Sequence, residues 1–204
     1  MRVLDLFAGL RGWSQPWKER GHECFTVDLD RRFEVSLHAD VLGLRAADLP
    51  WRPDVILASP PCEGFSVMRI GTNWTKDHHP KTEGAVHSLR LVEKTMALIQ
   101  ELQPRFFILE NPRAKLRKLP VVSGLERRTV TYCKYGEVRM KPTDLWGGFP
   151  PDLKLEPICR NGDICHVSAP RGSRTGTQGM DRAESAKIPK QLSLAICEAC
   201  ERAI

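Results

Sequence analysis

The chain has 204 residues, of which 41% are hydrophobic and 27% are charged. This composition predicts one folded core with at most a small insert, and it excludes a disordered or fibrous protein. Lys and Arg number 31 against 25 Asp and Glu, which gives a formal net charge of +6. An excess of this size suits a polyanionic partner without requiring one.

The sequence shows no secretory or membrane-spanning signal. The N-terminal stretch lacks a long apolar core, and about 18 consecutive apolar residues occur nowhere in the chain. We therefore expect a cytoplasmic protein that does not associate with membranes, and we expect a monomer. In that compartment the seven cysteines are thiols, metal ligands or catalysts rather than disulfides.

Apolar runs separated by Gly and Pro predict alternating strands and helices. In chain order we expect a strand at 2–7, a loop and helix at 9–20, strands at 23–27, 35–39 and 54–58, a polar stretch at 69–84, a helix at 87–102, a strand from 105, two late strands within 127–148 and a final helix within 186–203. The alternation predicts an α/β fold with a doubly wound, mostly parallel sheet.

The first predicted strand leads into a glycine-containing turn, "DLFAGLRGWS". In a parallel sheet such a turn lets the backbone approach a ligand closely, and an acid at the end of the next strand holds ribose hydroxyls. Asp28 has that position, and Asp40 after the third strand can accept from an adenine amino group. The alternative is a plain turn with solvated acids at the strand ends.

A second pair of chemical groups follows two other strands. Cys62 comes after the strand at 54–58 and Glu110 ends the strand from 105, so both emerge at the same sheet edge. A thiolate can add to C6 of a pyrimidine, and a carboxyl group that protonates N3 makes this addition easier. Arg139 or Lys141 is a candidate cation to stabilise the thiolate. Taken singly, Cys62 and Glu110 are each more typical of a structural role; taken together at one sheet edge, they favour the chemical one.

These motifs resemble those of the DNA (cytosine-5) methyltransferase family, in a short form such as bacteriophages and their hosts carry in restriction-modification. "DLFAGLRGWS" resembles the S-adenosylmethionine turn, "SPPCEGFS" the Pro-Cys nucleophile motif and "LENP" the Glu-Asn motif. "YGEVRMKP" is more loosely similar to the arginine-containing motif, and "AKIPKQLSLAI" to the final motif. The elements occur in family order and span most of the chain.

The resemblance implies a Rossmann-like methyltransferase that transfers a methyl group from S-adenosylmethionine to C5 of a flipped cytosine in double-stranded DNA. It makes Cys62 the nucleophile, Glu110 the residue that engages N3, and Arg139 a contact to the base. The residues that it assigns to the cofactor are Phe7, Ala8, Gly9, Gly12, Asp28, Leu29, Asp40, Val41 and Pro61. The stretch 67–84 corresponds to a mobile loop that closes on the base.

The same resemblance divides the chain into three parts. Residues 1–146 form the catalytic and cofactor-binding domain, 147–186 a minimal basic target-recognition insert, and 187–204 a helix that returns to the catalytic domain. Lys141, Arg160, Arg171 and Arg174 are candidate DNA contacts, with Arg182 as a further cation in the insert. For each of them, a solvated loop charge is the alternative.

The insert has too few residues for a core of its own, so a metal ion is a candidate stabiliser. Cys159, Cys165 and His166 with Cys133 offer three thiolates and one imidazole, the ligand set of a structural zinc site. Cys197 and Cys200 also form a CxxC pair, but on the final helix they are more typical of a packed face.

Several positions depart from the family pattern. Arg11 stands where a second glycine is usual, Glu137 and Val138 replace Pro-Gln, and Lys187 lies where an Asn is expected. A cation at Lys187 near the reactive end of the cofactor leaves open a carboxylated S-adenosylmethionine and a carboxymethyl product. The pattern is also compatible with the same chemistry on RNA, such as tRNA, and with a catalytically silent DNA-binding relative.

Overall fold

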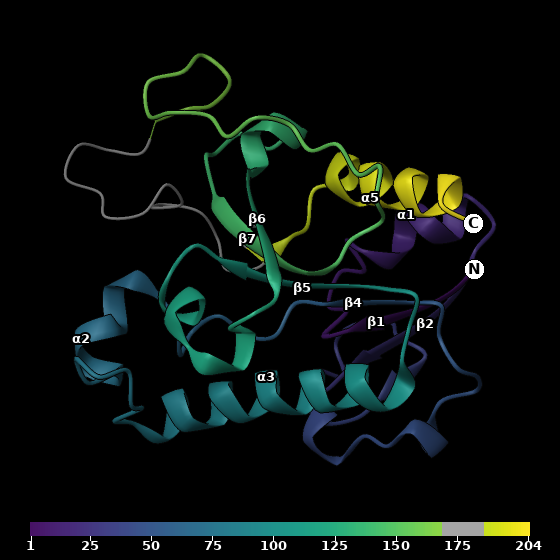
Figure 1. Ribbon diagram of the computed structural model, residues 1–204, viewed down its shortest axis with the longest axis horizontal. Coiled ribbons are helices and arrows are strands. Elements are labelled where there is room, and N and C mark those ends of the chain that lie inside the picture. The colour runs from purple at the N-terminus through teal and green to yellow at the C-terminus, as the bar shows by residue number, and fades with distance from the viewer. Residues whose placement is uncertain (169–185) are drawn as a thin grey trace.

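A computed structural model describes residues 1–168 and 186–204 of the protein. A single sheet of seven strands runs through the molecule in the order β3-β2-β1-β4-β5-β7-β6 (Figure 1). The strands are β1 (Arg2–Leu6), β2 (Glu23–Asp28), β3 (Leu37–His38), β4 (Val55–Ala58), β5 (Phe106–Pro112), β6 (Glu126–Thr131) and β7 (Pro142–Gly148). This order confirms the predicted doubly wound α/β architecture.

The first five strands are parallel, whereas β7 runs antiparallel to both of its neighbours, β5 and β6. The carboxyl ends of β1, β2, β4 and β5 therefore meet at one edge, where ligands bind in open parallel sheets. The antiparallel β7 brings a late part of the chain back across this edge, opposite Glu110 and its neighbours in β5.

Four α-helices are described: α1 (Ser14–Glu19), α2 (Ile70–Asn73), α3 (Glu83–Leu102) and α5 (Lys190–Arg202). The connections also contain six short 3₁₀ helices, η1 (Val41–Gly43), η2 (Ala46–Asp48), η3 (Val67–Arg69), η4 (Lys115–Lys118), η5 (Pro120–Val122) and η6 (Tyr132–Tyr135). In the part of the chain that the structure describes, no helix is long and apolar enough to cross a membrane.

Each face of the sheet is covered by its own helices, because successive strand side chains point to opposite faces. Leu4, Leu6 and Ile56 pack with α3 in one core, whereas Val3 and Leu57 join the core under α1 and α5. Figure 1 shows α3 along one side of the strands and α1 and α5 side by side on the other. Buried on both faces, the parallel strands appear in the sequence as continuous apolar runs.

One expectation about the elements needs correction. The third strand is only two residues long, Leu37–His38, rather than 35–39. The strand β7 continues to Gly148, two residues beyond the expected boundary after 146, and Gly148 pairs with Phe107.

The stretch 67–84, expected as a mobile loop, contains η3, α2 and the first two residues of α3. Asn73 and Trp74 are buried, and both donate hydrogen bonds to the carbonyl of Gly64, at 3.1 and 2.8 Å. Thr82 caps α3 by accepting from the Ala85 amide at 3.2 Å. These contacts anchor the stretch to the turn that carries Cys62.

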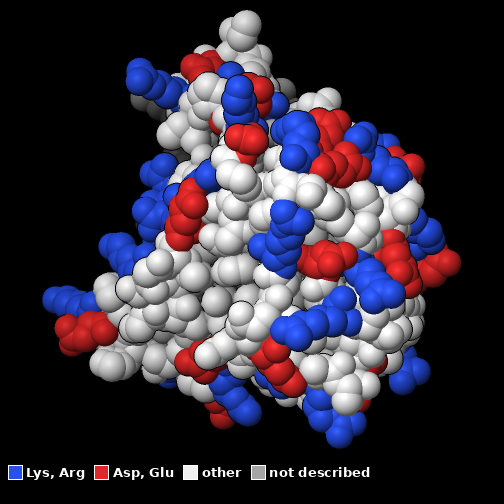
Figure 2. Space-filling model, turned by 45° about the vertical axis from the view of Figure 1, so that its right-hand side comes forward, with Lys and Arg blue, Asp and Glu red and all other residues white. Residues whose placement is uncertain are grey.

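Charges of both signs mix on one face of the molecule. On the face shown in Figure 2, Lys and Arg side chains are interspersed with Asp and Glu. The structure also contains surface ion pairs, such as Arg45–Asp48 and Lys190–Glu19. The net charge of +6 is thus not gathered into one broad basic field in this view.

Candidate active site

The turn that carries Cys62 is held in place from two sides. The Asn111 side chain donates to the carbonyl of Pro60 at 2.9 Å, and the Trp13 indole donates to the Ser59 hydroxyl at 2.8 Å. Asn111 belongs to β5 and Trp13 to the turn after β1, so both neighbouring strands fix the exit of β4. Cys62 itself is exposed beyond this fixed exit, where a substrate can reach it.

Glu110 lies at the same edge and is almost fully buried, with 4% of its surface exposed. Its Oε1 accepts a hydrogen bond from the Tyr132 hydroxyl at 2.9 Å, and the Lys141 ammonium lies 3.7 Å from the same oxygen. The Lys141 Nζ also lies 4.6 Å from the centre of the Tyr132 ring. A buried carboxylate is stable only with such partners, so the three side chains form one unit.

Electrostatics couple this unit to Cys62. The protein around the thiol removes much of its hydration, which raises the pKa of Cys62 although the residue as a whole is exposed. Lys141 opposes this rise in pKa and Glu110 adds to it. The thiol is therefore protonated at rest, and Lys141 is the cation placed to stabilise a thiolate when one forms.

Arg139, expected to contact the base, points elsewhere in this structure. Its guanidinium donates to the backbone carbonyls of Val167 and Ser168, at 3.0 and 2.9 Å. Lys141 was expected at a DNA-facing surface, but its side chain is only 11% exposed beside Glu110. Lys141 thus occupies the position next to the carboxylate, and Arg139 fastens a late segment of the chain.

The turn after β1 has the conformation that close ligand approach requires. Phe7, Gly9 and Arg11 all have positive φ angles, of 60°, 48° and 58°. For Phe7 and Arg11 this conformation is sterically unfavourable, because they carry side chains. The Gly9 amide donates to Asp28 Oδ2 at 2.8 Å, and the Asp30 amide donates to the other oxygen at 2.8 Å. Each carboxylate oxygen has a further lone pair, so Asp28 can still accept from a ribose hydroxyl.

The other residues assigned to the cofactor lie around this turn with different exposure. Leu29 is 67% exposed, so its apolar side chain is free to cover a planar ring. Asp40 is exposed and its Oδ1 accepts from the Leu42 amide at 2.9 Å, whereas the Val41 side chain is buried. Ala8 is buried and Pro61 is exposed. Together, the apolar Leu29 and the acceptors Asp28 and Asp40 fit an adenosine group.

Gly12 has a different reason for lacking a side chain. A Cβ at Gly12 would lie 2.9 Å from the carbonyl oxygen of Ile188, so the glycine makes room for the final segment rather than for the cofactor alone. Ser193 in α5 donates to the Trp13 carbonyl at 2.6 Å. The C-terminal segment thus returns to the turn after β1, and Lys187 just before Ile188 is exposed there.

Of the candidate DNA contacts in the insert, Arg160 lies among the described residues. Arg160 is exposed, and its amide donates to Asp163 in a turn. Arg171, Arg174 and Arg182 lie outside the described residues. The four candidate metal ligands, Cys133, Cys159, Cys165 and His166, are brought together by the fold.

Sequence reasoning missed Tyr132, Asn111 and Trp13 as parts of the site. Asn111 stands next to Glu110 in "LENP", so its motif carried a signal for it. Tyr132 and Trp13 reach the site only through contacts between distant segments, and nothing in their local sequence indicates it.

Comparisons with known proteins place the chain in a family. Residues 1–118 match the family model described as C-5 cytosine-specific DNA methylase. A frog virus 3 protein named "Probable DNA (cytosine-5)-methyltransferase" is 30% identical over 218 residues, covering 98% of this chain and 100% of that protein. The type II methyltransferase M.AplI of Arthrospira platensis is 30% identical over 140 residues, covering 61% of this chain and 36% of its own length.

Among solved structures, the Entamoeba histolytica methyltransferase EhMeth superposes with a TM-score of 0.54 at 11% identity. The match covers 78% of this chain and 56% of EhMeth, so the chain spans little more than half of that protein. At this identity the likeness shows the fold. The family model and the viral relative show more: this chain belongs to the C-5 cytosine-specific DNA methylase family.

Proposed function

We propose that the protein transfers a methyl group to C5 of cytosine in double-stranded DNA through a covalent bond between Cys62 and C6. The observation that carries this proposal is the cluster at the carboxyl ends of β4 and β5. There the exposed Cys62 lies in the electrostatic field of the buried Glu110 and Lys141. A silent DNA-binding relative would have no chemical use for this arrangement.

The side chains divide the reaction between them. The proton that Cys62 loses passes to the Glu110 carboxylate and from there to N3, while the Cys62 Sγ bonds to C6, so no proton is gained or lost overall. The resulting enamine is nucleophilic at C5 and takes the methyl group. Loss of the C5 proton to solvent re-forms the C5–C6 double bond and expels the Cys62 thiolate, and the N3 proton returns through Glu110 to Cys62. Because Tyr132 and Lys141 both engage Oε1 of Glu110, we assign the remaining oxygen, Oε2, to the cytosine.

S-adenosylmethionine would supply the electrophilic methyl group. The residues that would hold it are Phe7 and Leu29 at the adenine, Gly9 at the turn, Asp28 at the ribose, and Asp40 at the adenine edge. The cytosine must leave the duplex to reach Cys62, because C6 of a stacked base is not accessible to a side chain.

The test compares the wild-type chain with Cys62→Ser and Cys24→Ser, using a cofactor labelled in the methyl group. We expect label in DNA with the wild type and Cys24→Ser, and loss of incorporation by at least about 1,000-fold with Cys62→Ser. Cys24 is a partly buried thiol on β2 and controls for the loss of a cysteine. Equal incorporation by wild type and Cys62→Ser would refute the mechanism.

Two further measurements distinguish the substrate and the transferred group. Parallel incubations with DNA and with RNA of matched sequence distinguish the two substrates, and we expect label in DNA. Mass spectrometry of the modified base distinguishes a methyl from a carboxymethyl group; a carboxymethyl product would point to Lys187 and a carboxylated cofactor. DNA containing 5-fluorocytosine should trap the wild type covalently, because fluorine cannot leave C5 as a proton does.

A further inference from the structure

Outside the active site, four metal-ligating side chains converge on one point. Cys133 lies in η6 directly after β6, and Cys159, Cys165 and His166 lie in the segment that follows β7. Their three Sγ atoms and one histidine nitrogen all lie within 4.8 Å of one another. Two of the thiols are buried and the other two residues are half-buried.

Three distances between candidate ligand atoms match a tetrahedral metal site. The Cys159 Sγ is 3.8 Å from the His166 Nδ1, the Cys165 Sγ is 3.6 Å from the same nitrogen, and the Cys165 and Cys133 Sγ atoms are 3.7 Å apart. Ligands about 2.0 to 2.3 Å from a tetrahedral zinc ion are about 3.5 to 3.8 Å apart. The Cys133 and Cys159 Sγ atoms are 3.1 Å apart, a separation well above the roughly 2.05 Å of a disulfide.

We propose that Cys133, Cys159, Cys165 and His166 bind one Zn²⁺ ion through three thiolates and the Nδ1 of the imidazole. Four protein ligands close the coordination sphere, so the site is structural rather than catalytic. Zinc is the ion of choice because soft thiolates with one imidazole in tetrahedral array select it over the hard cations.

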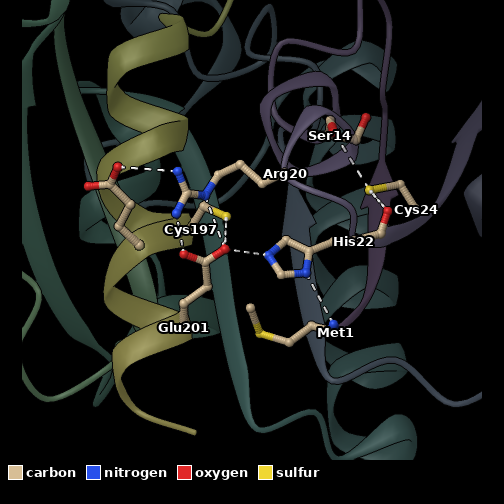
Figure 3. A network of polar contacts seen from close by, with 8 residues as sticks. Met1, Ser14, Arg20, His22, Cys24, Cys197 and Glu201 are labelled. Atoms are coloured by element: carbon tan, nitrogen blue, oxygen red, sulfur yellow. Dashed lines mark hydrogen bonds and ion pairs between the residues drawn. The ribbon is translucent and has the colours of Figure 1, made fainter.

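A second group of potential ligands, His22, Cys197 and Glu201, does not carry the same inference. Arg20 donates two hydrogen bonds to the Glu201 carboxylate, at 3.0 and 2.6 Å, and the His22 Nε2 lies 2.9 Å from it (Figure 3). The other nitrogen of His22 contacts the Met1 amine at 3.1 Å. These groups already satisfy one another without a metal.

The segment that provides three of the ligands has little apolar burial around them. Residues 156–168 contain no helix or strand, and Ile158, Ile164 and Val167 are exposed. The segment is held by scattered hydrogen bonds to the hairpin of β6 and β7, such as that from the Cys159 amide to the Thr131 hydroxyl at 3.0 Å. A zinc ion would add cross-links where apolar burial is missing.

The proposed site also adjoins the active site through the chain itself. Cys133 is the residue after Tyr132, whose hydroxyl donates to Glu110. A zinc ion on Cys133 would therefore fix η6 and, through it, the position of the catalytic carboxylate. It would equally hold the segment 159–166, which precedes the candidate DNA contacts Arg171 and Arg174 in the sequence.

The first test measures the metal content of the purified full chain by mass spectrometry. We expect about one zinc ion per chain in the wild type, in Cys24→Ser and in His79→Ala, and a large loss of zinc in Cys165→Ser and His166→Ala. The two control variants remove a cysteine and an exposed histidine away from the site. A wild type without stoichiometric metal, or an equal loss in the controls, would overturn the proposal.

A second test uses the wild type alone, so it does not depend on whether a variant folds. Replacement of the metal by Co²⁺ should give the thiolate-to-cobalt charge-transfer absorption of a tetrahedral sulfur-rich site. Peptide mapping without reduction should show Cys133 and Cys159 as free thiols. Failure to bind Co²⁺, or a Cys133–Cys159 disulfide in freshly prepared protein, would contradict the site.

A third test addresses the cross-link that the zinc ion would form between 156–168 and η6. On chelation, hydrogen exchange should accelerate at 156–168 and in η6, while the amides of β1 and β4 stay protected. Unchanged exchange in 156–168 after complete metal removal would refute this role, whatever the methylation activity proves to be.

Discussion

In the candidate active site, a tyrosine holds one oxygen of a carboxylate. Tyr132 is 2% exposed, and burial and the neighbouring Glu110 raise the pKa of its hydroxyl well above the ordinary value of 10.0. The hydroxyl therefore keeps its proton and remains a donor to Glu110 across the working range of pH. In this role Tyr132 is a positioning residue, since it acts through Glu110.

Tyr132→Phe should lower kcat about tenfold while leaving the KM for S-adenosylmethionine unchanged. A hydrogen bond to a charged group contributes roughly 1.5 to 3 kcal/mol, and about 1.4 kcal/mol corresponds to tenfold in rate. Steady-state kinetics on the two substrates would measure the split.

The matched control is Tyr135→Phe, because the Tyr135 hydroxyl accepts from the Glu156 amide at 2.9 Å outside the site. That variant should keep its kcat. An equal fall in kcat for both variants would show that Tyr132 acts only through the stability of η6.

At the scale of elements, the hairpin of β6 and β7 is fastened by a buried ion pair. Arg117 in η4 donates two hydrogen bonds to Asp144 in β7, at 2.8 and 2.6 Å, and Thr129 adds a third at 2.7 Å. Asp144 is completely buried and lies opposite Asn111 in the sheet. The pair thus fixes the strand that places Lys141 beside Glu110.

Arg117→Met should destabilise the protein by about 3 to 5 kcal/mol, because it leaves a buried carboxylate without its cation. Denaturant unfolding of wild type and variant measures this difference. The control Glu126→Gln removes the acid of an exposed pair with Arg128 in the same hairpin and should cost less than about 1 kcal/mol. A cost below about 1 kcal/mol for Arg117→Met would contradict the assigned role.

At the scale of the whole molecule, the two ends of the chain are joined by the network around Glu201. Arg20 and His22 follow α1, Glu201 belongs to α5, and His22 contacts the N-terminal amine (Figure 3). The hydrogen bonds from Arg20 are the main cause that lowers the pKa of Glu201 from 4.5 to about 2. The ionised form of Glu201 is thus stabilised more strongly in the folded state than in the unfolded state.

A lowered pKa predicts stability that is present above the ordinary value of 4.5 and is lost as the pH falls toward about 2. In that window the unfolded chain binds the extra proton, so acid favours unfolding. We expect the stability difference between wild type and Glu201→Gln to shrink as the pH falls through this range, measured by denaturant unfolding.

Glu198→Gln serves as the comparison, because Glu198 is about half exposed and lies 3.6 Å from the same Arg20. Its difference from the wild type should be small at every pH. A wild-type advantage over Glu201→Gln that stays constant from neutral pH to about pH 3 would rule out the linkage.

Arg11 departs from the family pattern in sequence, and its backbone conformation is unusual for a residue with a side chain. The sequence marks it as a side chain where a glycine is usual, and the structure gives it a φ of 58°, a region that glycine adopts without strain. Its guanidinium lies 3.2 Å from Glu34, an exposed partner. Sequence reasoning could find the unusual position, but only the backbone angle explains why glycine suits it.

The parallel core and the sheet edge of the candidate site could both be predicted from the sequence. Apolar runs buried on both faces and strand-end residues such as Asp28, Cys62 and Glu110 are local features, and parallel strands bring their carboxyl ends to one edge. The order of the motifs and the four candidate metal ligands could likewise be read from the chain.

Tertiary structure decided which groups touch. Lys141 rather than Arg139 reaches Glu110, Tyr132 donates to the same carboxylate, and Ile188 packs against Gly12. These contacts depend on the antiparallel register of β7 with β5 and on the return of the final segment to the first turn. A one-residue shift in that register would turn each side chain of β7 to the opposite face, and no local pattern in 132–148 specifies it.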